Sequence, residues 1–155
     1  MNAPLPPPAS PIPAAICEFL RAWHVLSLGI SDALGPWAAS LFYAFDEPAA
    51  DLIVLTSTKT RHGQAMLDTP LVGGTVVGQA VRITDIRGVQ FVARAKLLTD
   101  AGRSQQFDIF LERHPMARLK PSDVWALRLV DIKYTDNQLV FARKTRWHRD
   151  LAHCD

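Results

Sequence analysis

Apolar and polar residues alternate most clearly in the middle of the chain. From Gly88 to Leu97, every second residue is apolar, namely Val89, Phe91, Ala93, Ala95 and Leu97. A period of two predicts a β-strand with one face in a core and one mostly polar face. This strand anchors the interpretation of the weaker patterns on either side.

Shorter β-rich runs precede this strand. We expect strands at His24–Ser31, Trp37–Phe45 and Leu52–Thr56, with a turn at Asp32–Pro36 between the first two. The run Leu71–Gln79 is rich in Val and Thr but is interrupted by glycines. It is either a bulged strand or a strand that another backbone or a ligand approaches closely.

The C-terminal third predicts two more strands. Val124–Thr135 is β-rich. Its alternation of apolar and polar residues shifts by one position between Leu129 and Val130, and this parity slip indicates a bulge or a bend at a barrel corner. Asp136 and Asn137 suit a two-residue hairpin, so Gln138–Trp147 is expected to return as a strand.

Three segments have helical spacing. Residues Ile16, Phe19, Leu20 and Trp23 form one apolar stripe, Thr58–Leu67 opens with polar residues, and a third stripe ends at Pro115. The expected fold is therefore mainly β (α+β). The strands are expected to form an antiparallel β-barrel of six or seven strands with about three flanking helices, because closure removes unpaired sheet edges.

Composition indicates one domain. The chain has 155 residues, 48% of them apolar, which is enough for a sizeable core. We expect a mobile Pro-rich segment at 1–10, the folded domain at 11–150 and a short tail at 151–155. The N-terminal stretch has six prolines and no basic residue before its apolar part, unlike a signal peptide, and no membrane span is expected.

Charge and cysteine content exclude other classes. Seventeen Lys and Arg against 15 Asp and Glu leave a net charge of +2, so any anion site must be local. Two cysteines are too few for a disulfide framework, and no metal-ligand spacing occurs. A cytoplasmic location is the expectation.

The densest polar segment lies where the third strand ends and a helix begins. It reads Thr56-Ser57-Thr58-Lys59-Thr60-Arg61-His62. Hydroxyls, cations and a helix N-terminus together suit a phosphate. A plain Ser/Thr cap followed by solvated charges explains the same residues equally well.

Several blocks together resemble a known family. They are Trp37–Asp46, Leu55–His62, Gly74–Gln79, Ile86–Phe91, Val124-Trp125 and Ile132–Asn137. Over residues 16 to 150, the chain is similar to a small, largely uncharacterised bacterial family among the pyridoxamine 5'-phosphate oxidase-like FMN-binding split barrels. The resemblance implies a homodimeric antiparallel split β-barrel with an FMN cleft at the dimer interface. We therefore expect a flavin-dependent oxidoreductase acting on an unidentified small molecule.

The resemblance also implies site residues. Ser57-Thr58-Lys59 matches the Ser-x-Lys that holds the flavin phosphate in this superfamily, and Thr56, Thr60, Arg61 and His62 lie in the same turn. Contacts to the ring or ribityl chain would come from Ser40, Leu41 and Phe42, with Gln90 from the partner subunit and Trp147 closing the cleft. Ala38 and Tyr43 stand where authentic pyridoxamine-phosphate oxidases have basic residues, so oxidation of a vitamin B6 phosphate is not expected.

Two other functions fit parts of the sequence. The barrel could bind haem, another flavin or a regulatory ligand without turnover. Alternatively, the basic segment Arg143–Arg149, which contains Trp147, could bind single-stranded nucleic acid, although a solvated last strand explains it more simply.

Overall fold

A computed structural model describes residues 7–99, 101–138 and 143–149. Residues 1–6 of the expected N-terminal segment, the expected tail at 151–155 and the connection at 139–142 lie outside the described residues. Residues 7–10 adopt no helix or strand. No helix within the described ranges is long and apolar enough to span a membrane.

The described chain forms seven strands and three α-helices. The strands are β1 Val25–Asp32, β2 Gly35–Asp46, β3 Asp51–Leu55, β4 Leu71–Val77, β5 Arg87–Leu97, β6 Val124–Asp136 and β7 Arg143–His148. The helices are α1 Ala14–Ala22, α2 Arg61–Asp68 and α3 Ala101–Arg113, with short 3-10 helices η1 Ile83–Asp85 and η2 Pro115–Leu119. The expected fold class is confirmed.

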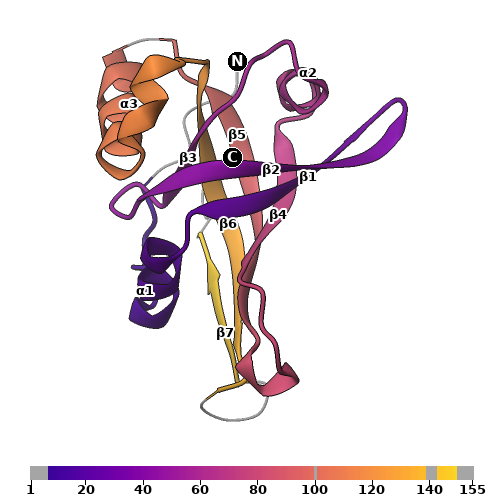
Figure 1. Ribbon diagram of the computed structural model, residues 1–155, viewed down its shortest axis with the longest axis vertical. Coiled ribbons are helices and arrows are strands. Elements are labelled where there is room, and N and C mark those ends of the chain that lie inside the picture. The colour runs from indigo at the N-terminus through magenta and orange to yellow at the C-terminus, as the bar shows by residue number, and fades with distance from the viewer. Residues whose placement is uncertain (1–6, 100, 139–142, 150–155) are drawn as a thin grey trace.

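The strands close into a barrel. Their order in the sheet is β3-β2-β1-β4-β5-β6-β7, and β3 also pairs with β6. All pairings are antiparallel. Strands β1 to β6 therefore form a ring, while β7 continues the sheet beside the second half of β6 (Figure 1).

The parity slip in β6 is a bulge, as predicted. Val92 pairs with Asp131 and Ala93 pairs with Leu129, so Val130 is the extra residue. Before the bulge, β6 pairs with β3, and after it β6 pairs with β7. This change of partner along one strand splits the barrel, because a bulge bends the strand and increases its twist.

The barrel interior forms the main core. Its largest fully buried side chains include Trp125, Tyr43, Leu26, Leu52 and Leu127. Helix α1 adds its predicted apolar stripe to the same core. A second cluster lies outside the barrel, where Phe110 of α3 packs near Ala44 of β2 and Ile53 of β3. This second cluster fixes α3 against the barrel wall.

The glycine-rich strand β4 is approached closely by its neighbours. It keeps a continuous register with β5 over its whole length. A Cβ on Gly74 would lie 2.4 Å from the Phe91 ring and 2.7 Å from the Ser27 carbonyl oxygen. Of the two alternatives for this strand, the close approach is the one observed.

The predicted two-residue hairpin after Thr135 was wrong. Strand β6 continues through Asp136, which pairs with Arg143, so the connection is longer. The Asp136 carboxylate accepts hydrogen bonds from the Gln138 backbone N–H and the Tyr134 hydroxyl, and the Asn137 N–H bonds the Ile86 carbonyl. Asp136 stays in the β6 ladder, where it also pairs with Arg87 of β5, and Asn137 is bonded to the segment just before β5, so the chain does not turn after Thr135.

Candidate functional site

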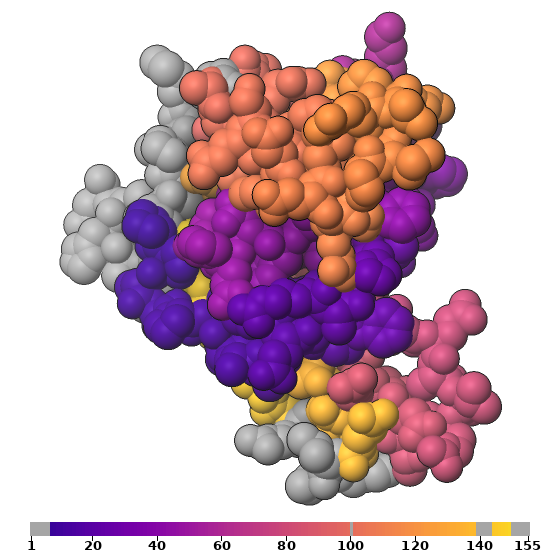
Figure 2. Space-filling model, turned by 60° about the vertical axis from the view of Figure 1, so that its left-hand side comes forward, coloured from indigo at the N-terminus to yellow at the C-terminus, as the bar shows by residue number. Residues whose placement is uncertain are grey.

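A large pocket lies between β2, the turn after β3, and the segment α3–η2. Its volume is about 1220 Å³, more than most small-molecule sites need. In Figure 2, the orange surface of α3 and η2 lies above the indigo and purple surface of the first strands. The lining residues are Ser40, Leu41, Phe42, Leu55, Ser57, Thr58, Lys59, Arg103, Phe110, Arg113, His114, Pro115, Met116, Ala117, Lys120, Pro121, Ser122 and Asp123.

One end of the pocket is the turn that joins β3 to α2. The Ser57 hydroxyl oxygen accepts the Lys59 N–H at 3.1 Å, and the Thr60 hydroxyl donates to the Ser57 carbonyl at 2.8 Å. Thr60 is the N-cap of α2, since its hydroxyl oxygen accepts the Gly63 N–H at 3.0 Å. The sequence-based alternative of a plain cap is therefore part of the structure, and it orders the turn.

A glycine lets this turn pack against the helix. A Cβ on Gly63 would lie 2.3 Å from the Ser57 carbonyl oxygen and 3.0 Å from the Thr58 Cα. A larger residue would push the turn away from α2. Gly63 therefore sets the position of Ser57 at the pocket.

Asp123 joins the same turn from a distant part of the sequence. Its carboxylate accepts the Thr58 backbone N–H at 2.7 Å, and its carbonyl accepts the Thr56 N–H at 3.1 Å. The hydrogen bond from Thr58 lowers the pKa of Asp123, with help from the charges of Arg103 and Lys59. Pairing of β3 with β6 brings residue 123 here.

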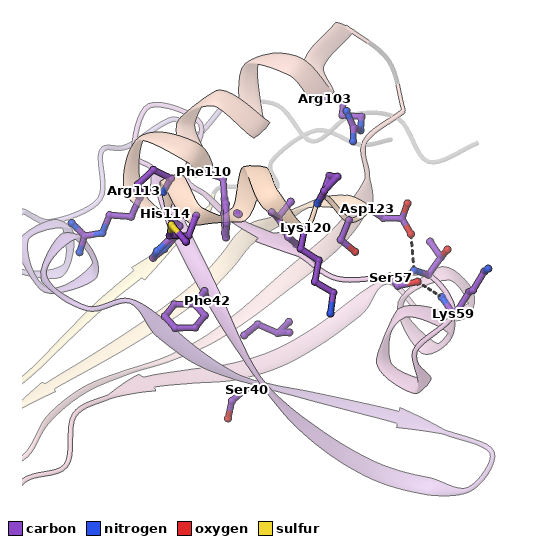
Figure 3. Close-up of a pocket in the computed structure, with 18 residues that line it drawn as sticks. Ser40, Phe42, Ser57, Lys59, Arg103, Phe110, Arg113, His114, Lys120 and Asp123 are labelled. Atoms are coloured by element: carbon purple, nitrogen blue, oxygen red, sulfur yellow. Dashed lines mark hydrogen bonds between the residues drawn. The ribbon is translucent and has the colours of Figure 1, made fainter.

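The pocket lining is mostly cationic where it is charged. Among the described lining residues, Lys59, Arg103, Arg113 and Lys120 are positive and Asp123 is the one carboxylate. Figure 3 shows Lys59 extending away from Ser57 at the edge of the pocket, while Lys120 extends from the end of η2 into the space below it. This excess of positive charge favours an anionic ligand.

The other end of the pocket is aromatic. The His114 ring lies 5.3 Å from the Phe42 ring and 4.8 Å from the Phe110 ring, measured between centroids. His114 Nε2 lies 2.8 Å from the Tyr43 carbonyl oxygen, which joins the end of α3 to β2. Sequence analysis did not select His114 because it lies at a helix end before a proline, where a structural role is common.

Five of the predicted site residues line this pocket. They are Ser40, Leu41, Phe42, Ser57 and Lys59. Sequence analysis missed Arg103, Lys120 and Asp123, which come from α3 and the loop before β6. The one sequence signal for these residues was the polar stretch before the buried strand that starts at Val124. That stretch did not indicate where in the fold its side chains would lie.

Arg61, the first residue of α2, is outside the pocket lining, and its side chain contacts the β1–β2 hairpin. Its Nε and Nη2 bond the two carboxylate oxygens of Asp32 at 2.7 and 2.8 Å, and Nη2 also donates to the Gly35 carbonyl. Its guanidinium lies 4.7 Å from the centre of the Trp37 ring. These contacts hold the hairpin against the start of α2.

Thr56, Thr60 and His62 also face elements other than the pocket. His62 Nε2 lies 2.6 Å from the Thr56 hydroxyl oxygen. Burial lowers the pKa of His62, which favours a neutral ring in this pair. Thr56 itself is buried, and its carbonyl accepts the Trp125 indole N–H at 3.0 Å. This pair supports the turn from behind.

The last two predicted residues lie elsewhere. Gln90 is on the exposed face of β5, in a smaller pocket with Asp131, Lys133 and Arg146. Trp147 is buried in the main core, and its indole donates to the Ser10 carbonyl. In this arrangement Trp147 neither lines the pocket nor presents a face for stacking a nucleic-acid base.

Arg149 is also buried. Its guanidinium donates to the carbonyl of Leu129, next to the bulge in β6, and to the carbonyls of Ala49 and Ala50 in the turn between β2 and β3. This cation of the basic C-terminal segment thus has a structural role. Within the described part of the chain, no group of three or more His, Cys, Asp or Glu residues is placed to hold a metal ion.

Sequence comparison identifies the family. The chain is 44% identical over 140 residues to the UPF0306 protein of Haemophilus ducreyi, covering 89% of this chain and 96% of the relative. It is 37% identical over 134 residues to a UPF0306 protein of Yersinia pestis, covering 86% and 91%. The chain belongs to the UPF0306 family. No family model matches it.

Solved structures share the fold. A haem-binding protein from Mycobacterium smegmatis superposes with a TM-score of 0.71 at 16% identity, covering 88% of this chain and 59% of that protein. A FAD-binding protein from Mesorhizobium loti gives 0.62 at 19%, covering 79% and 94%. The haem storage protein HutZ of Vibrio cholerae gives 0.62 at 17%, covering 90% and 96%. These proteins are split barrels, as this chain is.

Proposed function

We propose that this protein binds FMN in the large pocket and is a flavin-dependent oxidoreductase acting on a small molecule. The observation that carries the proposal is the pocket itself, which combines a hydroxyl- and cation-rich turn at one end with an aromatic wall at the other. A flavin nucleotide has the matching parts, an anionic phosphate and a planar ring system.

The chemistry of the side chains fits the phosphate end. Ser57 offers a hydroxyl, and Lys59, Lys120 and Arg103 offer cations, so hydrogen bonds to the phosphate would be charge-assisted. Asp123 already accepts the Thr58 N–H. Side chains, and not that backbone group, would therefore hold the phosphate. Lys59 would have to turn toward the pocket, which a long flexible side chain allows.

The apolar wall fits the ring. Leu41 and Phe42 of β2 line the pocket together with Phe110 and Met116. Phe42 is 59% exposed and Met116 is 73% exposed, so a bound ring would remove both from water. FMN, when bound, supplies hydride or electron transfer, and the protein positions and shields the ring.

We also propose that two copies associate through the outer face of β1, β2 and β4. Strand register places Val25 beside Phe42, and Ser27 between Ser40 and Thr75, on this face. Val25, Phe42 and Val77 are each more than 40% exposed, and small residues between them allow close approach. Such a dimer would cover the open side of the pocket at Ser40 and Phe42, and Gln90 of the partner subunit would lie on the covering face.

Native mass spectrometry of the freshly purified protein tests both parts of the proposal. We expect a dimer that carries one FMN per subunit. An absorption spectrum of the same sample separates the alternatives, since bound flavin gives two bands in the near-ultraviolet and blue, whereas haem gives a Soret band. A monomer without affinity for added FMN would contradict the proposal.

A single substitution tests the phosphate end. Lys59→Ala should remove most of the yellow colour when FMN is limiting, and Lys96→Ala is the matched control because Lys96 is an exposed lysine on β5 outside the pocket. Stoichiometric flavin retained by Lys59→Ala would refute the role assigned to Lys59.

A further inference from the structure

The aromatic end of the pocket contains the His114 ring, next to the Arg113 side chain. The backbone N–H of His114 donates to the Phe110 carbonyl at 2.8 Å, which extends the hydrogen bonding of α3 by one residue before Pro115 starts η2. In Figure 3 the ring lies below α3, between Phe110 and Phe42. His114 is half-buried and lines the pocket.

The bond to Tyr43 defines which nitrogen of the neutral His114 ring carries the proton. A backbone carbonyl only accepts hydrogen bonds, so Nε2, 2.8 Å from the Tyr43 oxygen, must be the donor. Nδ1 of the neutral ring then carries a lone pair. Among the described residues, no group hydrogen-bonds to Nδ1.

Nδ1 of His114, as a hydrogen-bond acceptor among apolar side chains, favours a ligand that carries a hydrogen-bond donor. The rings of Phe42 and Phe110 and the side chain of Met116, which line the pocket here, donate no hydrogen bond. The His24 ring lies 6.3 Å from the His114 ring, and Arg113 donates to His24 Nδ1, but neither is hydrogen-bonded to Nδ1 of His114. A purely apolar ring placed here would cover Nδ1 without replacing its contact with water, which is unfavourable. A ring with a donor at its edge would satisfy it.

We propose that the His114 end of the pocket recognises a planar ring that presents an N–H or O–H donor to Nδ1 of His114. The inference rests on the proposed role of the pocket as a flavin site. The donor has two possible sources: the N3–H edge of the flavin ring, or a second molecule, such as a phenol, bound beside the flavin.

Two pairs of probes separate these sources. The first pair is FMN and N3-methyl-FMN, which differ in the ring donor and keep the phosphate. The second pair is 4-methylphenol and 4-methylanisole, added to the FMN-loaded protein. Affinities are measured by flavin fluorescence for the first pair and by calorimetry for the second. The donor-bearing member of one pair should bind about tenfold more tightly than its methylated counterpart.

Variants at position 114 connect this preference to Nδ1. His114→Phe keeps the aromatic packing and removes both nitrogens, so it should reduce the tenfold preference to less than about twofold. His114→Gln keeps an N–H for the Tyr43 carbonyl and an amide oxygen that can still accept, so it should retain part of the preference. His148→Phe, on the exposed face of β7, should leave the preference unchanged.

The outcomes are distinct. A preference within the flavin pair assigns the donor to the flavin ring, and a preference within the phenol pair assigns it to a second molecule. No preference in either pair, or the same preference in His114→Phe as in the native protein, would overturn the inference while leaving FMN binding intact. If FMN itself does not bind, the proposed function fails, and the phenol pair tested on the flavin-free protein still decides the role of His114.

Discussion

Arg61 holds both carboxylate oxygens of Asp32, with N–O distances of 2.7 and 2.8 Å, across the gap between α2 and the β1–β2 hairpin. The same guanidinium lies over the ring of Trp37. Arg61 is one of the cations of the Thr56–His62 segment, and here it holds a hairpin in place. This gives Arg61 a structural role, and the proposed phosphate site therefore rests on the neighbouring Ser57 and Lys59.

Loss of this pair should lower stability in a pH-dependent way. The hydrogen bond from Arg61 lowers the pKa of Asp32 to about 2. Because the folded-state pKa is below the unfolded value, the contribution to stability is complete above about pH 4 and is lost as the pH falls toward 2. Asp32→Asn should therefore be less stable than the native protein at pH 7, with the difference shrinking between pH 4 and 2. Urea unfolding at these pH values measures it, and a difference independent of pH would contradict the assignment.

Gly63 provides a test of the turn geometry. Gly63→Ala introduces a Cβ 2.3 Å from the Ser57 oxygen, so the turn must shift. We expect a loss of about 1–3 kcal/mol of stability together with weaker FMN binding. Gly73→Ala is the control, because its Cβ would have its nearest neighbour at 3.8 Å. Native FMN affinity in Gly63→Ala would show that the turn does not hold the cofactor.

The features that could be predicted from the sequence are those that depend on the local pattern of residues within one strand or turn. The alternation of β5 and the parity slip at Val130 each have a direct structural counterpart, because side-chain direction follows residue number within a strand. Ser57 and Lys59 were found because they are adjacent in sequence. Asp123 and His114 were missed, because they reach the pocket only through β3–β6 pairing and the end of α3. The Asp136 hairpin failed for the same reason, since bonds to β5-side residues overrode the turn preference.

The buried carboxyl of Asp51 should give a second pH dependence of stability, opposite in sign to that of Asp32. It is buried near Arg128 and Arg149, and burial raises the pKa of its carboxyl to about 6. A folded-state pKa above the unfolded value means that stability is greatest at low pH and falls as the pH rises from about 4 to about 6. The stability difference between the native protein and Asp51→Asn should decrease by roughly 2–3 kcal/mol over this window. Parallel unfolding curves at pH 4 and 7 measure it; a constant difference would exclude the effect.

Substitution of Trp147 tests whether this residue belongs to the core or to the cofactor site. It is 4% exposed and its indole bonds the Ser10 carbonyl. Trp147→Ala should cost about 3–5 kcal/mol of unfolding free energy and leave the FMN affinity of the folded fraction unchanged. Thermal unfolding and flavin titration at low temperature measure the two quantities separately. Weaker FMN binding with native stability would instead place Trp147 at the cofactor.

The most direct test of the account is a titration of the flavin-free protein with FMN and with riboflavin, which lacks the phosphate. If the turn at Ser57 and Lys59 holds the phosphate with charge-assisted hydrogen bonds, FMN should bind on the order of a hundredfold more tightly than riboflavin. Equal affinity for the two compounds, or no binding of FMN, would contradict it.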